Sequence, residues 1–433
     1  MIVAESKRAV AEISDPIHGY FYLSSVEKDI VDSPLFQRLR RIRQLASAYL
    51  TYPSAQHTRF EHSLGAMHLA GYAGNVLKDK GYVSDDTIQM LRLAALLHDI
   101  GHGPFSHLFE EVLEVKGKVT HEDIGKMMIK ESVISDILAK HGYRADEVSD
   151  LAFGQSSNMF LNEIISGGLS VDLMDYLQRD AYFTGAHYGR IDAERIISSL
   201  EVYDNRLAIE RAALNSFESL LIARYQMFKA VYFHKTVRAA EVMLLKAMIL
   251  ADEHLHLSEA YKRVEDYMGL TDDTTFANLL SLKDEGRKEL ALTKKLAEDY
   301  RDRRLFKSVY ESILQASSRL INRLTDARYL RDRCNEIASI AGVDPDMVYI
   351  DSAKAPSIPR APGKEVPRDL VLVGKPFGIK RIEMKDIPLI SSIMGYMNMI
   401  RVYTTEEHRE KVANAALSVF GSETESWYER IAM

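Results

Sequence analysis

Residues 96–107 of this 433-residue chain read Leu96-Leu97-His98-Asp99-Ile100-Gly101-His102-Gly103-Pro104-Phe105-Ser106-His107. Apolar residues at helical spacing lead into this stretch, and two glycines and a proline end the expected helix. His98 and Asp99 therefore stand where the apolar face of the helix would otherwise continue. Neighbouring side chains on a helix point about 100° apart. The side chains of His98 and Asp99 can therefore both face the apolar core only when a group at the edge of the core binds both of them. A divalent cation does this, because it accepts imidazole nitrogen and carboxylate oxygen together.

Two other clusters carry groups of the same kind. His62 falls in the first turn of a helix expected after Arg59, and Asp172 falls in a later helix. One face of that later helix is polar, with groups at i, i+4, i+7 and i+8: Asp172, Tyr176, Arg179 and Asp180. Each residue alone also fits a structural role, as a core histidine or a helix cap. Taken together, two imidazoles and two carboxylates predict a metal site: His62, His98, Asp99 and Asp172.

Two histidines outside this set, His57 and His68, lack a partner motif and are interpreted as structural. His102, His107 and His121 lie beyond the four candidate ligands and are interpreted differently, as hydrogen-bond donors and proton sources. Thr120 is expected to cap a helix that starts at His121, which would present the positive end of the helix to an anion.

Composition favours an enzyme of the cell interior. The single cysteine, Cys334, excludes a disulfide framework and a cysteine-rich zinc site. The first residues do not resemble a signal peptide, and no apolar run is long enough to span a bilayer, so we expect a cytoplasmic protein without membrane contact. A net charge of −7 argues against binding along nucleic acid.

The pattern predicts a mainly α-helical fold from about residue 26 to residue 342. Long helices are expected over 86–99, 216–252 and 305–325, and a short hairpin over 202–209, where Asp-Asn separates alternating apolar residues.

Composition changes at residues 351–368, where four prolines stand among basic residues and predict an extended connector. After the connector, strands are expected at 370–373, 379–384 and 400–403, with a helix near 389–396 and a final helix. We therefore expect three segments: a catalytic core at 1–205, a helical extension at 206–343 that makes subunit contacts, and a small α+β appendage at 344–433.

The order His62, His98-Asp99, Asp172 resembles the HD-domain metal-dependent phosphohydrolases. The sequence motifs around these residues more closely resemble those of the deoxynucleoside triphosphate triphosphohydrolases. Within that family, the resemblance is to the branch of the sterile-alpha-motif and HD-domain protein, and it extends over about residues 15–307. The motifs that carry it are Asp15-Pro16-Ile17-His18-Gly19, Phe36-Gln37-Arg38-Leu39-Arg40, Arg59-Phe60-Glu61-His62-Ser63-Leu64-Gly65, His98 to His107, and Asp175-Tyr176 with Arg179-Asp180. The resemblance implies an HD-domain helical core that binds a divalent metal, which the ligand set leaves open as Mg, Mn, Fe, Ni or Zn.

The resemblance also implies roles for other residues. His102 and His107 match the catalytic end of the family's site, with His107 as general acid, and His121 with Glu122 match a catalytic pair. Substrate-binding positions are matched by Gln44, Leu45, Arg59, Tyr176, Asp180 and Tyr232. In the family, Gln44 and Leu45 stand where the deoxyribose 3′-hydroxyl is held and the 2′ carbon is crowded.

Relatives in this branch assemble into tetramers when nucleotides bind between subunits. Positions that match their regulatory sites are Asp32, Gln37, Arg40, Arg303 and Lys307. A carboxylate suits guanine, since it accepts from both N1–H and the exocyclic amine. The resemblance thus implies a homotetramer or dimer with a GTP or dNTP activator, although Arg303 and Lys307 also fit a solvated helix face.

The resemblance therefore implies hydrolysis of a dNTP to deoxynucleoside and inorganic triphosphate. One alternative is an HD phosphohydrolase for another nucleotide phosphate ester. A second is a nucleotide-sensing regulator whose HD site is vestigial.

Overall fold

A computed structural model describes residues 9–114, 116–117, 119–284, 286–314, 323–324, 326–356, 369–374, 378–383, 396–421 and 426–431. Contacts divide the chain into two compact units, and each unit draws on several stretches of sequence rather than on consecutive segments. Unit 1 comprises 1–227, 256–277 and 358–393, and unit 2 comprises 228–255, 278–357 and 394–433. The fold is mainly α-helical with a small sheet-containing C-terminal part, as the sequence predicted.

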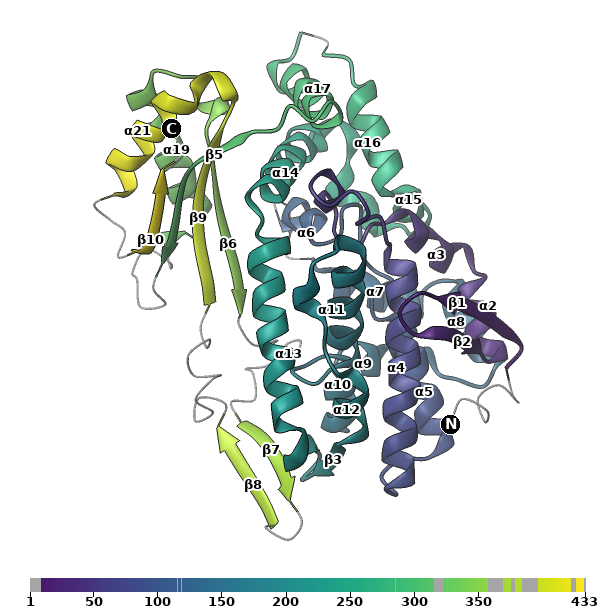
Figure 1. Cartoon of the computed structure of the whole chain (residues 1–433). Coiled ribbons are helices and arrows are strands. Elements are labelled where there is room, and N and C mark those ends of the chain that lie inside the picture. The colour runs from purple at the N-terminus through teal and green to yellow at the C-terminus, as the bar shows by residue number, and fades with distance from the viewer. Residues whose placement is uncertain are drawn as a thin grey trace. The chain divides into compact units, whose positions relative to one another are not determined.

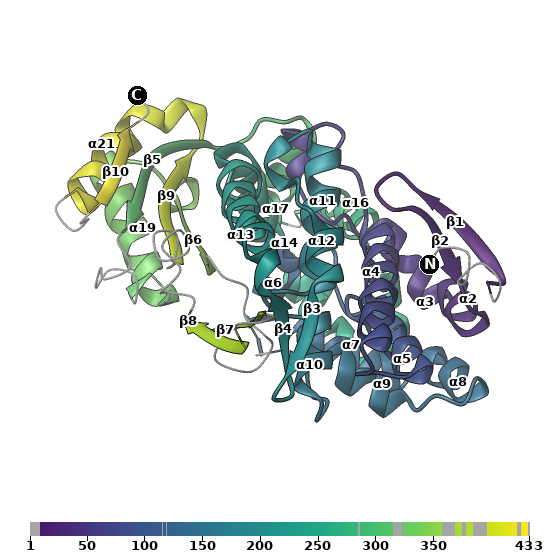
Figure 2. The ribbon, with the colours of Figure 1, turned by 60° about the horizontal axis from the view of Figure 1, so that its bottom comes forward.

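Unit 1 is mostly helical (Figures 1 and 2). Its α-helices are α2 (Ser25–Val31), α3 (Pro34–Gln37), α4 (Arg59–Asp79), α5 (Asp85–Leu97), α6 (His107–Glu114), α7 (His121–Lys130), α8 (Val133–Lys140), α9 (Ala145–Ala152), α10 (Met159–Ile165), α11 (Val171–Thr184), α12 (Ala193–Ser198), α13 (Leu214–Met227) and α15 (Val264–Gly269). Short 3-10 turns lie at Arg38–Arg41, Ala48–Leu50, His187–Gly189, Arg211–Ala213 and Leu257–Lys262. Its strands are β1 (Ala11–Asp15), β2 (Gly19–Leu23), β3 (Leu200–Tyr203), β4 (Arg206–Glu210), β7 (Asp369–Gly374) and β8 (Gly378–Glu383). Helix α16 (Asp272–Ser281) starts in this unit and ends in unit 2.

At the centre of unit 1, α4 packs against both α5 and α11 (Figure 1). Polar residues set where each helix begins. Thr58 and Glu61 form a capping box for α4, while Ser84 and Ser170 accept backbone N–H groups at the starts of α5 and α11. His62 and Asp172 lie in the first turns of α4 and α11, and His98 follows the last residue of α5, where the three side chains come together.

Two hairpins flank the helices of unit 1. β1 and β2 pair antiparallel at the N-terminal side, and β3 and β4 pair over residues 200–209. This pairing confirms the hairpin predicted at 202–209. At its turn, Asp204 and Asn205 take left-handed backbone angles, with φ of 53° and 57°. That conformation suits a two-residue turn, which Asp and Asn tolerate. β4 also pairs with β7, which pairs with β8, so the strands predicted near 370–373 and 379–384 are confirmed.

Unit 2 combines helices with a four-stranded antiparallel sheet of order β10-β5-β9-β6 (Figure 1). Its helices are the π-helical turn Phe228–Tyr232, α14 (Lys235–Leu255), α17 (Lys288–Arg301), α19 (Ala327–Ala341) and α21 (Arg409–Phe420), with 3-10 turns at Pro345–Met347 and Glu406–His408. Its strands are β5 (Lys307–Leu314), β6 (Tyr349–Pro356), β9 (Tyr396–Thr404) and β10 (Ser426–Ile431). Apolar residues of α19 and α21 cover the sheet: Ile337, Ala338, Val412, Ala416 and Phe420 pack with Val309, Tyr310, Ile400 and Val402.

In the second half of the chain, the structure differs from two of the predicted helices, and other predictions fall outside the described residues. The helix predicted over 305–325 is wrong at its start, since residues 307–314 form β5 and pair with β9 and β10. The helix predicted over 216–252 is interrupted by the π-helical turn between α13 and α14. The prolines of the predicted connector beyond residue 356, and nearly all of the helix predicted near 389–396, lie outside the described residues.

Among the described helices, none is both long enough and apolar enough to cross a membrane.

Candidate metal centre and histidine cluster

The four predicted metal ligands lie together in unit 1. His62 Nε2 is 3.2 Å from Asp172 Oδ1 and 3.6 Å from Asp99 Oδ2. His98 Nε2 is 3.5 Å from Asp99 Oδ1 and 3.7 Å from Asp172 Oδ1. His62 comes from the first turns of α4, Asp172 from the first turn of α11, and His98 and Asp99 directly follow α5. Side chains from three helices thus converge on one point.

The donor atoms at this point fit a cation. Nε2 of His62 and Nε2 of His98 are buried, and neither has a hydrogen-bond partner in the part of the chain that the structure describes. Burial alone would lower the pKa of His62, but Asp172 and Asp175 raise that pKa to about 10, which reflects the negative charge around the ring. Two unpartnered imidazole nitrogens facing two carboxylates are the donor set of a divalent metal ion.

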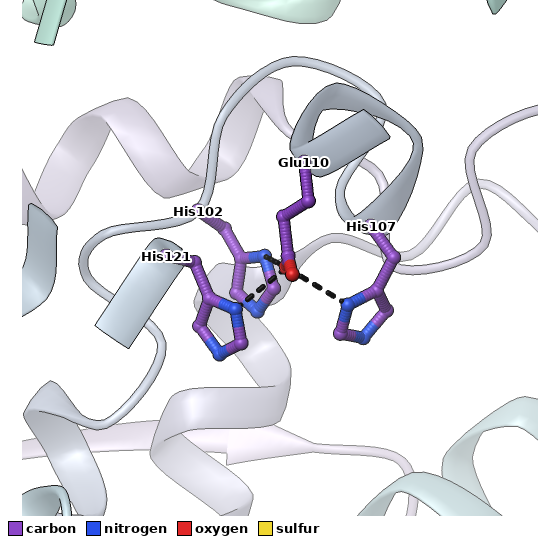
Figure 3. A group of neighbouring side chains, drawn as sticks. All are labelled: His102, His107, Glu110 and His121. Carbon is purple, nitrogen blue, oxygen red and sulfur yellow. Dashed lines mark hydrogen bonds and ion pairs between the residues drawn. The ribbon is translucent and has the colours of Figure 1, made fainter. Parts of the chain in front are cut away.

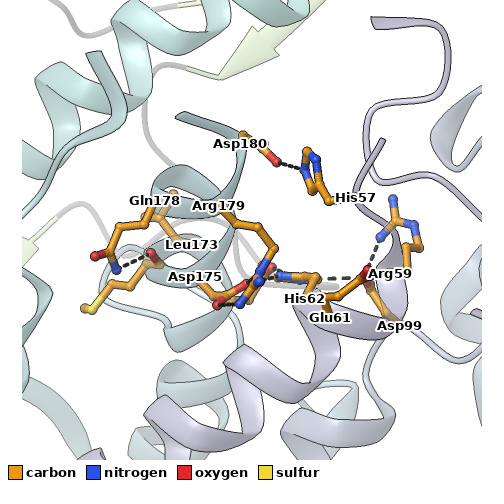
Figure 4. Close-up of polar contacts among 12 residues, drawn as sticks. His57, Arg59, Glu61, His62, Asp99, Leu173, Asp175, Gln178, Arg179 and Asp180 are labelled. Atoms are coloured by element: carbon orange, nitrogen blue, oxygen red, sulfur yellow. Dashed lines mark hydrogen bonds and ion pairs between the residues drawn. The ribbon is translucent and has the colours of Figure 1, made fainter. Parts of the chain in front are cut away.

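Asp99 connects this centre to its surroundings. The guanidinium of Arg59 donates to Asp99 Oδ2 (Figure 4), and His102 Nε2 lies 3.2 Å from Asp99 Oδ1. Burial opposes ionisation of Asp99, yet Arg59 holds its pKa well below the usual range. The predicted phosphate contact Arg59 therefore lies at the metal ligands themselves.

A second cluster comprises His102, His107, Glu110 and His121 (Figure 3). Glu110 Oε1 lies 2.6 Å from His121 Nδ1, 3.1 Å from His107 Nδ1 and 4.0 Å from His102 Nδ1. The rings of His102 and His121 stack with centroids 3.9 Å apart. His102 is buried, whereas the side chain of His107 is 72% exposed. His102 thus borders both groups, and His107 faces solvent, where it can exchange protons.

Sequence reasoning missed Glu110. The expected partner of His121 was the adjacent Glu122, but the carboxylate bonded to His121 is that of Glu110. Burial raises the pKa of Glu122, whereas His107 and His121 lower the pKa of Glu110 against the effect of its own burial. The available signal was spacing, because Glu110 follows His107 by three residues on one helix face.

Three of the expected sugar-binding residues, Asp180, Gln44 and Leu45, are grouped around His57. Asp180 Oδ1 lies 2.8 Å from Nε2 of His57 (Figure 4), and the ring of His57 stacks on Phe183. The backbone N–H of Gln44 donates to the carbonyl of His57, and Leu45 follows directly in the chain. His57, interpreted from the sequence as structural, therefore touches two residues of the expected pocket.

The other expected binding residues have different surroundings. The hydroxyl of Tyr176 bonds to Arg224 in unit 1, and the ring of Tyr232 packs edge-on against Phe228 in unit 2. Asp32 pairs with Lys28, and Gln37 accepts from Arg40. Arg303 and Lys307 belong to unit 2, where Arg303 follows the end of α17 and Lys307 starts β5. These two residues therefore do not share a helix face.

The loop between the two clusters has an unusual backbone. Phe105 and Ser106 both have φ of 58°, a region that residues other than glycine rarely adopt. Asp272 holds this conformation, because its Oδ1 accepts the N–H of Phe105 at 2.6 Å and its Oδ2 accepts the N–H of Arg43 at 3.0 Å. Ser106 Oγ in turn accepts from Arg59 and donates to the carbonyl of Arg43. A buried carboxylate from α16 thus stabilises the loop that carries the histidines.

This carboxylate predicts a pH effect on stability. Burial raises the pKa of Asp272 to about 6, against the backbone hydrogen bonds from Phe105 and Arg43. This value lies above the unfolded-state pKa of about 4, so the contribution to stability is present at low pH and is lost as pH rises through about 6. Asp272→Asn cannot ionise. Between pH 5 and pH 7.5, we expect the wild type to lose about 1–2 kcal/mol of unfolding free energy relative to this variant.

Urea unfolding of both proteins at the two pH values measures this difference. Asp273→Asn, which alters the exposed neighbouring carboxylate, is the control and is expected to follow the wild type. Parallel pH dependence of the wild type and Asp272→Asn would contradict the prediction.

Comparison with known sequences agrees with this geometry. Residues 59–180 match the HD domain, and residues 191–429 match the HD associated region, which alone covers more than half of the chain. The first match begins at the start of α4 and ends in α11, so it contains the four converging ligands.

Relatives include both uncharacterised proteins and enzymes. An uncharacterised Bacillus subtilis protein is 34% identical over 314 residues, covering 68% of this chain and 71% of that protein. An uncharacterised Methanocaldococcus jannaschii protein is 40% identical over 241 residues, covering 55% of this chain and 49% of its own length. The human deoxynucleoside triphosphate triphosphohydrolase SAMHD1 is 30% identical over 350 residues, covering 69% of this chain and 55% of that enzyme. The match thus spans about half the length of the last two relatives.

Two solved structures are similar over nearly the whole chain. A hypothetical protein from Aquifex aeolicus superimposes with a TM-score of 0.74 at 30% identity, covering 94% of this chain and 99% of that one. A phosphohydrolase from Bacteroides thetaiotaomicron gives a TM-score of 0.73 at 28% identity, covering 92% and 100%.

Proposed function

The chain belongs to the HD-domain family of metal-dependent phosphohydrolases, and on that premise we propose that it hydrolyses deoxynucleoside triphosphates to deoxynucleoside and inorganic triphosphate. The observation that carries this proposal is the adjacency of the metal centre and the histidine cluster. His102 lies 3.2 Å from Asp99 and 4.0 Å from Glu110, so it borders both groups. The relatives named as triphosphohydrolases support the same reaction.

The metal centre and the cluster would have separate tasks. A divalent ion held by His62, His98, Asp99 and Asp172 would polarise a phosphoryl oxygen and lower the pKa of water. Arg59, which already bonds to Asp99, would bind the charge of the α-phosphate. His107, exposed and bonded to Glu110, would give a proton to the departing sugar oxygen.

Selection of deoxyribose would depend on the residues beside His57. Among the described residues, Oε1 of Gln44 has no hydrogen-bond partner, although this atom is buried. A buried acceptor of this kind suits the 3′-hydroxyl of a sugar, because leaving it unpaired costs about 1–3 kcal/mol. His57 holds Asp180 in place as a second acceptor, and Leu45 would crowd a 2′-hydroxyl without offering it a partner.

Chromatography of the products tests the proposal. The full chain is incubated with each dNTP and each rNTP, with Mg or Mn and with Fe, Ni or Zn in turn. We expect intact triphosphate and deoxynucleoside from dNTPs, and at least about tenfold slower hydrolysis of the matching rNTPs. Stepwise release of phosphate or pyrophosphate would contradict the proposal and favour an HD phosphohydrolase for another phosphate ester. Absence of turnover under all conditions would favour a nucleotide-sensing role.

Regulation by nucleotide is a further part of the proposed function. We expect GTP or a dNTP to promote assembly of a homotetramer, in which Asp32, Gln37, Arg40, Arg303 and Lys307 would contact the activator. Asp32 is half-exposed to solvent and pairs only at the surface with Lys28, so its carboxylate can exchange that partner for guanine. The molecular mass of the protein, measured by light scattering with and without GTP, tests whether the nucleotide promotes assembly. An unchanged mass, together with hydrolysis that does not respond to GTP, would contradict the regulatory part alone.

A further inference from the structure

Asp175 is a buried carboxylate that no catalytic role accounts for. It lies one helical turn after Asp172 on α11 and is fully buried. Its Oδ2 lies 2.8 Å from Nδ1 of the metal ligand His62, and its Oδ1 lies 2.7 Å from Nε2 of His18 (Figure 4 shows the His62 side). The guanidinium of Arg179 donates to both oxygens at 2.9 Å. One carboxylate therefore joins a metal ligand to the N-terminal hairpin.

The turn of the hairpin is anchored to the same charge group. Asp15 Oδ1 accepts the backbone N–H groups of Ile17 and His18, both at 2.9 Å, which shapes the turn between β1 and β2. Asp15 Oδ2 accepts from Arg179 at 2.7 Å. Gly19 completes the turn with φ of 81°. The hairpin is thus connected to Asp175 in two ways. His18 contacts Asp175 directly, and Asp15 contacts Arg179, which in turn donates to Asp175.

The packing of α4 leaves room for this arrangement. Gly65 lies one turn after His62, and a Cβ atom there would lie 1.8 Å from Asp175 Oδ1 and 2.6 Å from a nitrogen of Arg179. A side chain at this position would therefore push the carboxylate away from His62. The absence of a side chain lets Asp175 reach the helix that carries the metal ligand.

These contacts determine which ring nitrogen of His62 is available to bind a metal ion. An ionised carboxylate only accepts, so Nδ1 of His62 donates to Asp175, and Nε2, which faces Asp99 and Asp172, would release its proton when it binds a metal ion. Carboxylates bonded to the second nitrogen of a ligating histidine fix the ring orientation and strengthen metal binding. We propose that the N-terminal hairpin turn, through His18 and Asp15, is a positioning element of the metal centre that acts on His62 through Asp175.

Titration of the metal-stripped full chain with Mn²⁺ and with Zn²⁺, followed by calorimetry, tests the proposal. Asp175→Asn is expected to weaken binding by about 10–100-fold. His18→Gln is expected to weaken binding by about threefold to tenfold, because Arg179 still holds the carboxylate. The control is His141→Gln, since His141 makes a similar 2.9 Å contact with Asp29 elsewhere in unit 1, and it is expected to bind both ions as the wild type does.

A purely structural role would give a different pattern. It would lower the melting temperature of the metal-stripped His18→Gln protein without changing its metal affinity, and that result would overturn the proposal. Wild-type affinity in both His18→Gln and Asp175→Asn would overturn it as well. If Asp175→Asn does not fold, His18→Gln still decides, because it leaves the buried pair of Asp175 and Arg179 intact.

Hydrogen exchange provides a second, reciprocal readout. If the hairpin affects metal binding, metal binding must stabilise the hairpin by the same coupling free energy. We expect saturating Zn²⁺ to slow amide exchange in residues 11–23 of the wild type and to have little effect there in Asp175→Asn. Unchanged exchange in the wild type would contradict the coupling. Neither measurement uses a nucleotide, so a failed dNTP assay and a failed coupling would be told apart.

Discussion

Replacing Asp172 with alanine is expected to lower phosphohydrolase activity at least about 10³-fold, which corresponds to about 4 kcal/mol of transition-state stabilisation. Asp172 Oδ1 lies 3.2 Å from His62 Nε2 and 3.7 Å from His98 Nε2, so it is the carboxylate that faces both imidazoles from α11. Without it, three donors would remain, and the site would have one negative charge fewer. Both metal affinity and orientation of a bound phosphate would fall.

Activity and metal affinity are measured on the same preparation. Asp136→Ala is the matched control, since Asp136 also lies in the first turn of a helix, α8, but is exposed to solvent. The control is expected to stay within about twofold of the wild type, as surface substitutions change stability little. A chelator should abolish wild-type activity, and one of the added metals should restore it. Activity of Asp172→Ala within tenfold of the wild type would rule out this metal centre as the source of catalysis.

Glu110→Gln is expected to reduce kcat by about 10²–10⁴-fold while leaving metal affinity at His62 and Asp99 unchanged. The carboxylate bonds to both His107 and His121, and both lower its pKa, so it remains ionised. A glutamine keeps the shape but removes the negative charge that stabilises a protonated histidine. The proton donor of the proposed reaction would then lose its charge partner.

Steady-state kinetics and metal titration separate the possible results. Glu111→Gln is the matched control, because Glu111 is the adjacent carboxylate on α6 and is exposed. A loss confined to kcat supports the assigned role of the cluster. A fall in metal affinity of Glu110→Gln would contradict it and show that the cluster itself holds an ion. Activity within threefold of the wild type would remove Glu110 from the chemistry.

Much of the metal centre could be predicted from the sequence. His98 and Asp99 directly follow the apolar helix α5, and His62 and Asp172 follow capping residues that place them in first turns. Local rules fix where such helices start, and ligand chemistry then restricts which polar groups belong together. The structure brings these four side chains together, and their role as metal ligands stays a prediction.

The hydrogen-bond partners of the candidate site histidines could not be predicted in the same way. His121 bonds to Glu110 rather than to Glu122, and His57 bonds to Asp180, 123 residues away. Asp175 belonged to a recognised motif, but nothing local indicated that it would join His62 to His18. Hydrogen bonds between distant segments depend on how helices pack, and sequence spacing reports only neighbours on one helix.

The fold shows the same division. The two-residue turn at Asp204-Asn205 was predictable, because left-handed angles depend on the turn residues themselves. Residues 307–314 were predicted as helix but form β5 between β9 and β10. A strand in the middle of a sheet gains its hydrogen bonds from other parts of the chain, so its own apolar pattern does not decide between helix and strand.

The sequence by itself therefore determined the helical core, the starts of α4 and α5, and the choice of four candidate metal ligands. Each of these follows from side-chain chemistry and from interactions within a few residues. Only the tertiary structure decided which carboxylate meets which histidine, how Asp272 holds the loop at Phe105, and how the N-terminal hairpin reaches His62. These contacts join segments far apart in the chain, and their geometry exists only once the helices have packed.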